Sequence, residues 1–504
     1  NYSDQLNDNL KIGADYRLNH SFSKNDQYKH IENFAPKNIY TSDANSKTKN
    51  ETYGHNFGTN LEWTKNNTKI YFYPSFSNSS STNSSISDSK TYSDLGDLRN
   101  QMNQPSNGKS NSNTFKTLLS LNQKFKNKSY LDFNSSISIG KTDRNSFINS
   151  TTLYTNDTIA DVYRNINEKN ISKNNQYNFD VKYTYPITDS LKIAVGSAYN
   201  LTDSETNNRT WNYNDVTGEY DNLNNDLTRF YSTQLNEFNP YAQLLLNKNK
   251  ISATVRFGAN IYNQQNFGTF KADDYSSTQN KTLPDISGNI RYQSGNNSLS
   301  LMYNYQTSLA STSQVLPILD ETDPLDVFKG NPDLDPNKAH QINLMFSNFD
   351  RKTRQGFNAN LGYTYNESSI VNFTEMDYSI YKRTTTYENV KGNYRLNGNF
   401  FFNKQYQKGI NKFRVNVGMS ASYALTQGFR DAVKYEQYNT TLSPTLRLNW
   451  DYGDYLTISP SYRLNFTNSK YVNYSINNQN NITHSFAIKT ISTFPKNLTW
   501  TNDF

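Results

Sequence analysis

Six acidic side chains lie in one short stretch of the sequence, close enough together to bind a metal ion. They are Asp320, Glu321, Asp323, Asp326, Asp333 and Asp335. Carboxylate oxygens at this density suit Ca²⁺, a hard cation that prefers oxygen ligands. The spacing matches no fixed calcium-binding loop, so we expect a solvated acidic loop over 320–335 and keep calcium as the alternative. We expect no other cofactor.

The five histidines give few combinations for metal binding or catalysis. They are His20, His30, His55, His340 and His484. No two of them have a spacing that would place both on one strand face as metal ligands, so we expect no metal site and place them at the surface or in a lumen. His340 and His484 are the only candidates for an acid–base pair, but no catalytic motif flanks them, and we expect no enzyme. The absence of Cys removes thiolate sites and disulfides.

Other polar residues alternate with apolar ones in long runs, which predicts strands that place them on one face. From Ile251 the odd positions up to Ile261 are apolar, and the even positions include Arg256 and Asn260. From Phe413 the same pattern separates the apolar odd positions from Arg414 and Asn416. The runs at 299–305, 357–366 and 456–466 behave alike. We predict that Arg256, Asn260, Arg414 and Asn416 line a lumen.

The length of these runs favours a membrane protein over a soluble sandwich. Strands of about 10 or more residues can cross a bilayer at a tilt, whereas strands in soluble domains average about 5 to 6 residues. A barrel in lipid needs only one apolar face, which agrees with 34% hydrophobic but 14% aromatic residues. No run of about 18 apolar residues occurs, which excludes helical spans. A net charge of +7 without basic blocks does not indicate a nucleic-acid surface. We interpret it as a generic solvated surface, with a rim facing anionic lipopolysaccharide as the alternative.

The connections alternate between short turns and long polar stretches, as in outer-membrane barrels. Short links are expected near 65–67, 126–128, 187–190, 247–250, 295–297, 351–354, 404–411, 451–454 and 495–496. Long loops are expected at 25–47, 79–110, 142–170, 202–226 and 311–337. This predicts an all-β, large antiparallel transmembrane β-barrel of about 19 strands. Because that count is odd, we expect missing strands.

Aromatic residues at strand ends predict a girdle on the periplasmic side. Its candidates are Trp63, Trp450, Tyr452, Tyr455 and Trp500, each beside a short link. Chance placement at strand ends is the alternative. Pro74, Pro444 and Pro460 fall inside strand-like runs, so each must cost a ladder hydrogen bond or mark a bulge.

The last of the long stretches carries a motif. It reads Ser313-Gln-Val-Leu-Pro-Ile-Leu-Asp320 and then Gly330-Asn331-Pro332-Asp333-Leu334-Asp335-Pro336. Gly and Pro in a loop that enters a strand usually fix backbone geometry, so we interpret the motif as structural, with ligand binding as the alternative. It resembles the Gly-Asn-Pro-x-Leu-x-Pro segment of TonB-dependent outer-membrane receptors, and the strand rhythm is similar to that of the outer membrane β-barrel family proteins of Bacteroidota. Asp335 stands where that family often has Lys.

The resemblance implies parts that the sequence does not contain. It implies a periplasmic immunoglobulin-like or carboxypeptidase-regulatory-like module and a plug inside the barrel. It also implies further strands after Phe504, for about 22 in total and up to about 26. No signal peptide is present, although export requires one. We therefore expect residues 1–504 to be a partial outer-membrane barrel domain from a Gram-negative bacterium.

Three functions follow from these expectations. The first is a TonB-dependent-type receptor that takes up a large nutrient, such as a glycan, a peptide or an iron chelate, through contact with an inner-membrane motor. The second is a non-transporting barrel subunit of an outer-membrane assembly or secretion complex. The third is a passive porin-like channel. Expected partners are lipid, lipopolysaccharide and the motor, together with a surface lipoprotein lid or other outer-membrane proteins.

Overall fold

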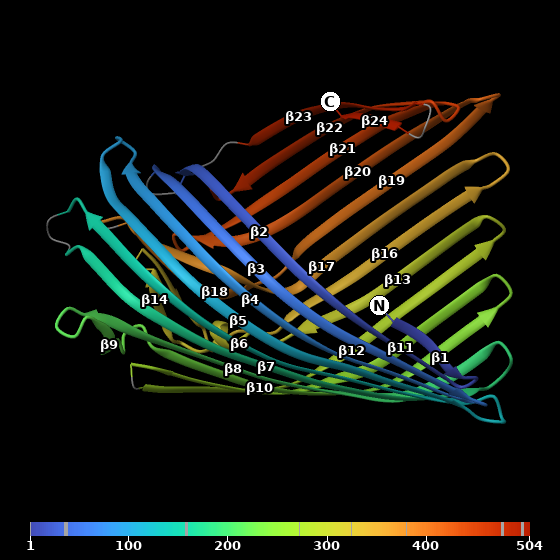
Figure 1. Cartoon of the computed structure of the whole chain (residues 1–504), viewed down its shortest axis with the longest axis horizontal. Helices are drawn as coiled ribbons and strands as arrows, with labels where there is room; N and C mark the ends of the chain where they lie inside the picture. The colour runs from blue at the N-terminus through green and yellow to red at the C-terminus, as the bar shows by residue number, and fades with distance from the viewer. Residues whose placement is uncertain are drawn as a thin grey trace.

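The computed structural model describes residues 2–34, 39–156, 160–271, 273–323, 325–379, 381–474, 478–494 and 498–503. Almost all of this backbone is β-strand, and the strands form a tilted wall that curves around a wide hollow (Figure 1). Consecutive wall strands are antiparallel, which confirms the predicted fold class. Among the described residues, no helix is long and apolar enough to cross a membrane.

In the part of the chain that the structure describes, twenty strands make up the wall. They are β1 (Tyr2–Asn7), β2 (Leu10–Phe34), β3 (Ile39–Lys65), β4 (Thr68–Ser93), β5 (Leu98–Lys124), β6 (Tyr130–Tyr154), β7 (Val162–Pro186), β8 (Leu191–Asn214), β10 (Arg229–Lys248), β11 (Ile251–Phe270), β12 (Asp273–Ser294), β13 (Asn297–Ser308), β16 (Asn337–Asp350), β17 (Gln355–Asp377), β19 (Asn393–Lys408), β20 (Asn411–Arg430), β21 (Val433–Tyr452), β22 (Leu456–Val472), β23 (Gln479–Phe494) and β24 (Leu498–Asp503). Each pairs with the next in this order.

Five short elements lie at one end of the wall. They are β9 (Glu219–Leu223), α1 (Thr312–Val315), β14 (Leu319–Asp323), β15 (Asp326–Lys329) and β18 (Lys382–Val390). β18 pairs antiparallel with the C-terminal part of β17, and β15 pairs with β18 in parallel. These elements surround the end of the barrel opposite the short turns, which we call the mouth (Figure 1).

The predicted count of about 19 strands is one too low. The strand that the sequence did not predict is β1, whose residues YSDQLN show no apolar alternation. β1 forms a hairpin with β2, and Asp8 and Asn9 are the turn between the two strands. With twenty wall strands the number is even, so the argument from an odd count was wrong. Within the described residues β1 pairs with β2, and β24 pairs with β23.

Within the described residues, four of the predicted long loops, 25–47, 79–110, 142–170 and 202–226, consist mostly of strand. Residues 79–110, for example, form the far halves of β4 and β5, which remain paired to Tyr92 and Leu98. A bilayer needs only about 9 to 11 residues per strand, yet β2 to β8 have 24 to 27, so their far halves extend beyond the lipid. There neither face needs apolar residues, which removes the alternation on which the prediction relied. Backbone pairing continues, and polar pairs such as Asn78 and Asn113, at 2.8 Å, support it.

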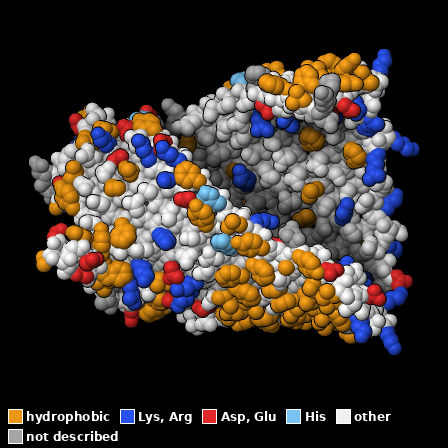
Figure 2. All heavy atoms as spheres, in the orientation of Figure 1, with side chains coloured by type: hydrophobic (Ala, Val, Ile, Leu, Met, Phe, Trp, Pro, Cys, Tyr) orange, Lys and Arg blue, Asp and Glu red, His pale blue; other side chains and the backbone are white. Residues whose placement is uncertain are grey.

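The apolar side chains face outward near the opposite end of the strands. On β11, Ile251, Phe257 and Ile261 are exposed on the outer side, while Tyr262 and Gln264 point inward and are buried. Cross-strand pairing continues this face around the wall, as in the row Leu301, Leu344 and Leu361. Figure 2 shows the hydrophobic side chains as a broad band, with the hollow beside it. This is the surface expected where a barrel meets lipid.

Within the described residues, the predicted short links are confirmed as tight turns at one end of the barrel (Figure 1), and the link at 495–496 lies outside those residues. Asn66, Asn249 and Gly409 occupy the left-handed region there, with φ of 53°, 53° and 59°. Asn and Gly tolerate this backbone conformation, which two-residue hairpin turns require. Composition at the turns therefore sets the register of the strands that follow.

The three prolines interrupt the ladder without shifting it. The β21–β22 pairing breaks next to Pro444 and again next to Pro460, and the register is the same on both sides. The β3–β4 pairing breaks in the same way opposite Pro74. The prediction allowed either a lost ladder hydrogen bond or a bulge at each proline. The structure shows lost hydrogen bonds at all three prolines and a bulge at none of them.

Candidate functional site at the mouth of the lumen

The segment between β13 and β16 folds into the lumen as a compact unit, which we call the inner lobe (residues 309–336). Its core consists of Val315, Leu316, Ile318 and Leu334, which are at most 5% exposed and pack against Phe270 of β11. The lobe lies on the inward side of the wall, where Gln264 donates to the Ala310 carbonyl at 3.1 Å. The prediction of a loop over 311–337 was therefore wrong, because these apolar residues find a partner surface inside the barrel.

The Gly330–Pro336 motif supplies the geometry of this lobe. A side chain at Gly330 would place its Cβ 1.9 Å from the Leu316 carbonyl oxygen, so only glycine fits. Asn331 donates its backbone N–H to Gln314 O at 2.6 Å and its side-chain amide to Tyr387 O at 2.8 Å. Leu334 and Pro336 are buried, whereas Pro332 and Asp333 are exposed. The geometry agrees with a structural role for the motif.

The acidic stretch is not the solvated loop that its composition suggested. Asp320 forms an ion pair with Arg229 of β10, and Asp326 holds Arg383 of β18 through both carboxylate oxygens. Glu321 lies 3.4 Å from Lys382. Asp333 and Asp335 remain exposed. Asp320, Glu321 and Asp326 therefore each face a cation, and among the described residues no three acidic or histidine side chains form a group that could hold a metal.

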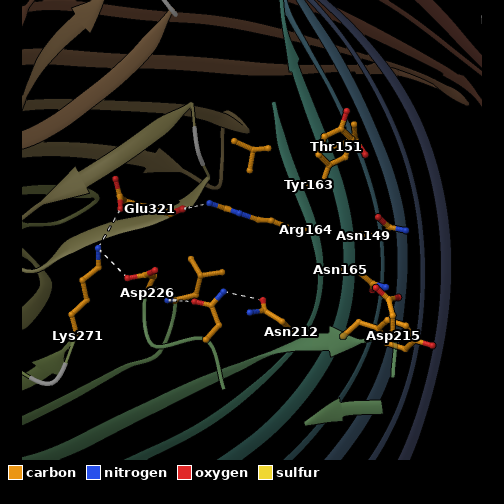
Figure 3. A pocket seen from close by; sticks show the side chains of 14 residues that line it. Asn149, Thr151, Tyr163, Arg164, Asn165, Asn212, Asp215, Asp226, Lys271 and Glu321 are labelled. Atoms are coloured by element: carbon orange, nitrogen blue, oxygen red, sulfur yellow. Dashed lines mark hydrogen bonds and ion pairs between the residues drawn. The ribbon is translucent and has the colours of Figure 1, made fainter. Parts of the chain in front are cut away.

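A cavity of about 640 Å³ opens between the lobe and the wall. It lies where β7 separates from β8, since their pairing ends at Ile166 and Asn212 while β6 and β7 remain paired to Val162. Figure 3 shows Arg164 extending from β7 toward Glu321, with its guanidinium 3.1 Å from the Glu321 carbonyl oxygen. Lys271 lies between Asp226, at 3.3 Å, and Glu321, at 4.0 Å. Burial lowers the pKa of Arg164, and the charges of Asp323 and Glu321 oppose that shift.

The cavity lining is rich in amides and short of apolar side chains. Besides the charged groups it contains Asn149, Asn165, Asn212 and Asn224, and Asn224 donates to Asn212 at 2.9 Å. Such a lining can donate and accept hydrogen bonds to a polar ligand from several directions. Sequence reasoning missed it because Arg164 and Asn212 fall in stretches interpreted as loops.

The predicted lumen-lining residues lie on the inward face. Arg256 stacks on Tyr241, 3.6 Å from the ring centre, and its Nε donates to Asp285 at 2.7 Å. Asn239 donates to Asn260 and Asp285. The strand pattern indicated the face, but it did not indicate that these side chains form one connected network.

The second predicted pair of lumen residues lies on β20. Arg414 donates to Asp451 of β21 at 2.6 Å, and Asn416 donates to the Arg447 carbonyl at 3.4 Å. The partners come from the neighbouring strand at the same height, so the lumen surface is fixed by short cross-strand contacts. A ligand that passes along this wall meets charges already neutralised by neighbours.

Two hairpin tips meet across the mouth, although far apart in the sequence. Tyr40 of β3 is buried against Tyr381, at the turn between β17 and β18, with ring centres 5.5 Å apart. Tyr378 donates to Asp431 at 2.5 Å, and burial raises the pKa of Tyr378. The mouth is therefore narrowed by contacts between the tips as well as by the lobe.

All five histidines lie on the outward face, in agreement with the surface option of the prediction. Four of them lie next to tyrosines: His55, His340 and His484 contact Tyr16, Tyr303 and Tyr462 at 2.8, 3.0 and 2.8 Å, and His20 stacks on Tyr53. The fifth, His30, contacts Asp43 at 2.6 Å beyond the apolar band. Aromatic and amphipathic rings at this height suit the boundary between lipid and water.

The contact of His30 gives a pH-dependent prediction. The hydrogen bond to Asp43 raises the pKa of His30 above its ordinary value of 6.5, helped by the charges of Asp43 and Glu32 and opposed by burial. The charged histidine therefore steadies the β2–β3 hairpin fully below pH 6.5, and this effect disappears as the pH rises through the raised pKa. An NMR titration should give His30 a midpoint above 6.5, and Asp43→Asn should lower it. An unchanged midpoint in the variant would contradict the contact.

The girdle candidates lie at the end of the barrel with the short turns. Trp450 stacks on Phe413, with ring centres 6.2 Å apart. The ring centre of Tyr452 lies 6.3 Å from that of Trp450 and 6.5 Å from that of Tyr455. Trp63 pairs with Ile70 across β3 and β4, and Trp500 is 63% exposed on β24. Their contact with lipid headgroups remains a prediction.

The comparisons with known proteins point to the same architecture. A family model described as "Outer membrane protein beta-barrel family" matches residues 123–499. No curated protein sequence matches the chain. The chain is similar to a solved structure of the copper transporter OprC, with a TM-score of 0.54 and 10% identity over 98% of this chain and 73% of that one.

Two further solved structures match the chain with lower TM-scores. The outer membrane transporter YddB from Escherichia coli has a TM-score of 0.46 and 9% identity over 99% of this chain and 76% of that one. The siderophore receptor PirA from Pseudomonas aeruginosa has a TM-score of 0.42 and 10% identity over 99% and 77%. At such identities the likeness concerns the fold alone.

Proposed function

Because the chain belongs to the outer membrane protein beta-barrel family and therefore lies in the outer membrane, we propose that it is the barrel of a TonB-dependent-type receptor. Its cargo would be a nutrient too large for passive entry, such as a glycan, a peptide or an iron chelate. Uptake would draw its energy from contact with an inner-membrane motor. The similarity to OprC, a copper transporter, is consistent with this proposal.

The observation that carries the proposal is the inner lobe. It stands in the mouth of a polar lumen, it bounds the 640 Å³ cavity, and the ion pair between Asp320 and Arg229 of β10 attaches it to the wall. A passive channel needs an open mouth, whereas a receptor needs a surface that holds cargo before it passes. Ion pairs at a partly wet contact can be exchanged for contacts with a ligand at low cost.

A reversible cross-link tests whether the lobe must move. Thr312 of the lobe contacts Thr233 of β10 through their hydroxyls, and the chain has no Cys, so Thr233→Cys with Thr312→Cys would introduce the only thiols. We expect the oxidised double variant to lose uptake and a membrane-permeant reductant to restore it. The single variant Thr312→Cys is the control. Normal uptake by the fully oxidised double variant would argue against a moving lobe.

A second measurement separates the transporter from the alternative, a non-transporting subunit of an assembly or secretion complex. Cells that express the protein are compared with and without the inner-membrane motor. The transporter should lose growth on its nutrient when the motor is removed. A subunit should keep its role and should copurify with a stable partner. Motor-independent function with such a partner would refute the proposal.

A further inference from the structure

A group of cations lies on the outward face of the wall, just beyond the apolar band. Its members are Lys49, Lys109, Lys141, Lys169, Lys173 and Arg209, and we call it the outer basic patch. The continuous apolar face of β3 to β6 ends at one cross-strand row, in which Phe57, Phe76, Phe115 and Ile139 are successive partners, and farther out there are separate apolar side chains such as Ile86 and Phe147. The patch begins at Lys141, the next outward position beyond Ile139. Figure 2 shows Lys and Arg side chains on the part of the surface beyond the band.

The arrangement of the patch is unfavourable without a ligand. Lys141 lies directly opposite Lys173 in the β6–β7 ladder, and Lys169 lies directly opposite Arg209 in the β7–β8 ladder. Like charges at such positions destabilise a sheet. The first pair is relieved by Asp143, 3.0 Å from Lys141, and by Glu205, 3.2 Å from Lys173.

The other cations have no such relief. Among the residues that the structure describes, Lys109, Lys169 and Arg209 form no ion pair with an acidic side chain, and all three are exposed. Lys109 and Lys169 are joined through Asn145 in one cross-strand row, and Arg209 continues that row. Three cations in a line on neighbouring strands could hold anionic groups that a chain of sugars presents side by side.

A groove of about 460 Å³ lies at the same place on the outward face. Lys49 and Lys109 line it together with Thr82, Asn107 and Phe147. Its one carboxylate, Glu51, accepts hydrogen bonds from Tyr53 at 2.9 Å and contacts His20 at 3.2 Å. With Glu51 occupied by these neighbours, the two lysines, the hydroxyl and the amide remain to bind a phosphorylated sugar.

We propose that the outer basic patch binds the phosphate groups of the glycolipid that forms the outer leaflet. The patch lies on the outside of the wall, away from the lumen, so transported cargo does not reach it. It lies above the lipid-facing band, where the headgroups of the outer leaflet are found. Lys and Arg suit phosphate because they donate charge-assisted hydrogen bonds, and Arg does so with two parallel bonds. The proposal depends on the outer-membrane location and not on the transport function.

The test measures binding of purified lipopolysaccharide to the full chain in detergent. One preparation keeps its lipid A and core phosphates, and the other has been dephosphorylated. The variant combines Lys109→Gln, Lys169→Gln and Arg209→Gln. The matched control combines Lys65→Gln, Lys126→Gln and Lys408→Gln, which removes the same charge near the short turns. Heat-modifiable mobility on gels verifies that each variant is folded.

We expect the triple variant to bind the phosphorylated form about fivefold more weakly for each charge removed, and roughly a hundredfold in all. The control should bind as the parent does, and the dephosphorylated form should not distinguish the three proteins. Equal losses in variant and control would overturn the proposal. So would competition by inorganic phosphate as effective as that by the phosphorylated lipid, because the site would then take a free ion.

Thermal unfolding gives a second readout that a structural role of the cations would not produce. In dephosphorylated lipid the variant should unfold at the same temperature as the parent or higher, because the Lys169–Arg209 repulsion has been removed. In phosphorylated lipid the variant should unfold at a lower temperature, because the parent alone is stabilised by its ligand. A shift of the same sign in both lipids would overturn the proposal.

Discussion

Replacing Gly330 by Ala should release the inner lobe from the wall while the barrel stays folded. The new Cβ would lie 1.9 Å from the Leu316 carbonyl oxygen and 3.0 Å from the Ser313 carbonyl oxygen, and both are backbone atoms. Neither can move without displacing Leu316, which is 1% exposed in the lobe core. Overpacking of this kind costs about 1 to 3 kcal/mol, and more where backbone must shift.

Hydrogen exchange measures this effect residue by residue. The amide of Asn331, which donates to Gln314 at 2.6 Å, should exchange faster in the variant, and amides of β4 and β5 should be unchanged. Gly398→Ala is the matched control, because the nearest atom to its Cβ would be 3.8 Å away. If Gly330→Ala left the lobe amides as protected as in the parent, the close approach would not matter for the fold.

Replacing Leu361 by Arg should prevent insertion of the barrel into lipid. Leu361 is 47% exposed on the outward face, between Leu344 and Gly398 in a cross-strand row. It lies in the middle of the apolar positions of β17, which run from Phe357 to Tyr365. An arginine near the bilayer midplane costs about 2 to 4 kcal/mol. The fraction of protein that folds into vesicles should fall accordingly, and heat-modifiable mobility on gels measures this fraction.

The neighbouring residue provides the control for this change. Asn360 lies on the same strand with its side chain on the inward face, so Asn360→Arg adds the same charge to a wet lumen. We expect it to insert as the parent does. Similar losses for the two substitutions would mean that the assigned faces of β17 are wrong, since a slip of one residue exchanges the two faces.

The membrane-facing part of the barrel could be predicted closely from the sequence. Alternation from Ile251 and from Phe413 identified the strands, and the short links located the turns, because lipid on one side and water on the other impose a period of two. The strand count failed at β1, whose six mostly polar residues are held by pairing to β2 and not by any burial that composition would reveal.

The candidate site could be predicted only in part. The Gly330–Pro336 motif marked a place where backbone geometry matters, and Arg256 and Asn260 were assigned to the inward face. The cavity itself could not be predicted, because Arg164, Lys271 and Glu321 come from segments with no relation in sequence. From the sequence, the charged residues of the cavity looked solvated, since contacts such as that of Lys271 with Glu321 form only after the lobe has folded back into the barrel.

By itself the sequence determined which faces of the strands meet lipid, where the short turns lie and that the barrel is embedded in a membrane, because each of these follows from local period and turn chemistry. Only the tertiary structure decided how far the strands continue beyond the membrane, that the segment 309–336 lies inside the mouth, and that Lys169 faces Arg209 on the outer wall. Polar strands and loops have the same composition, and what separates them is pairing between residues distant in the chain.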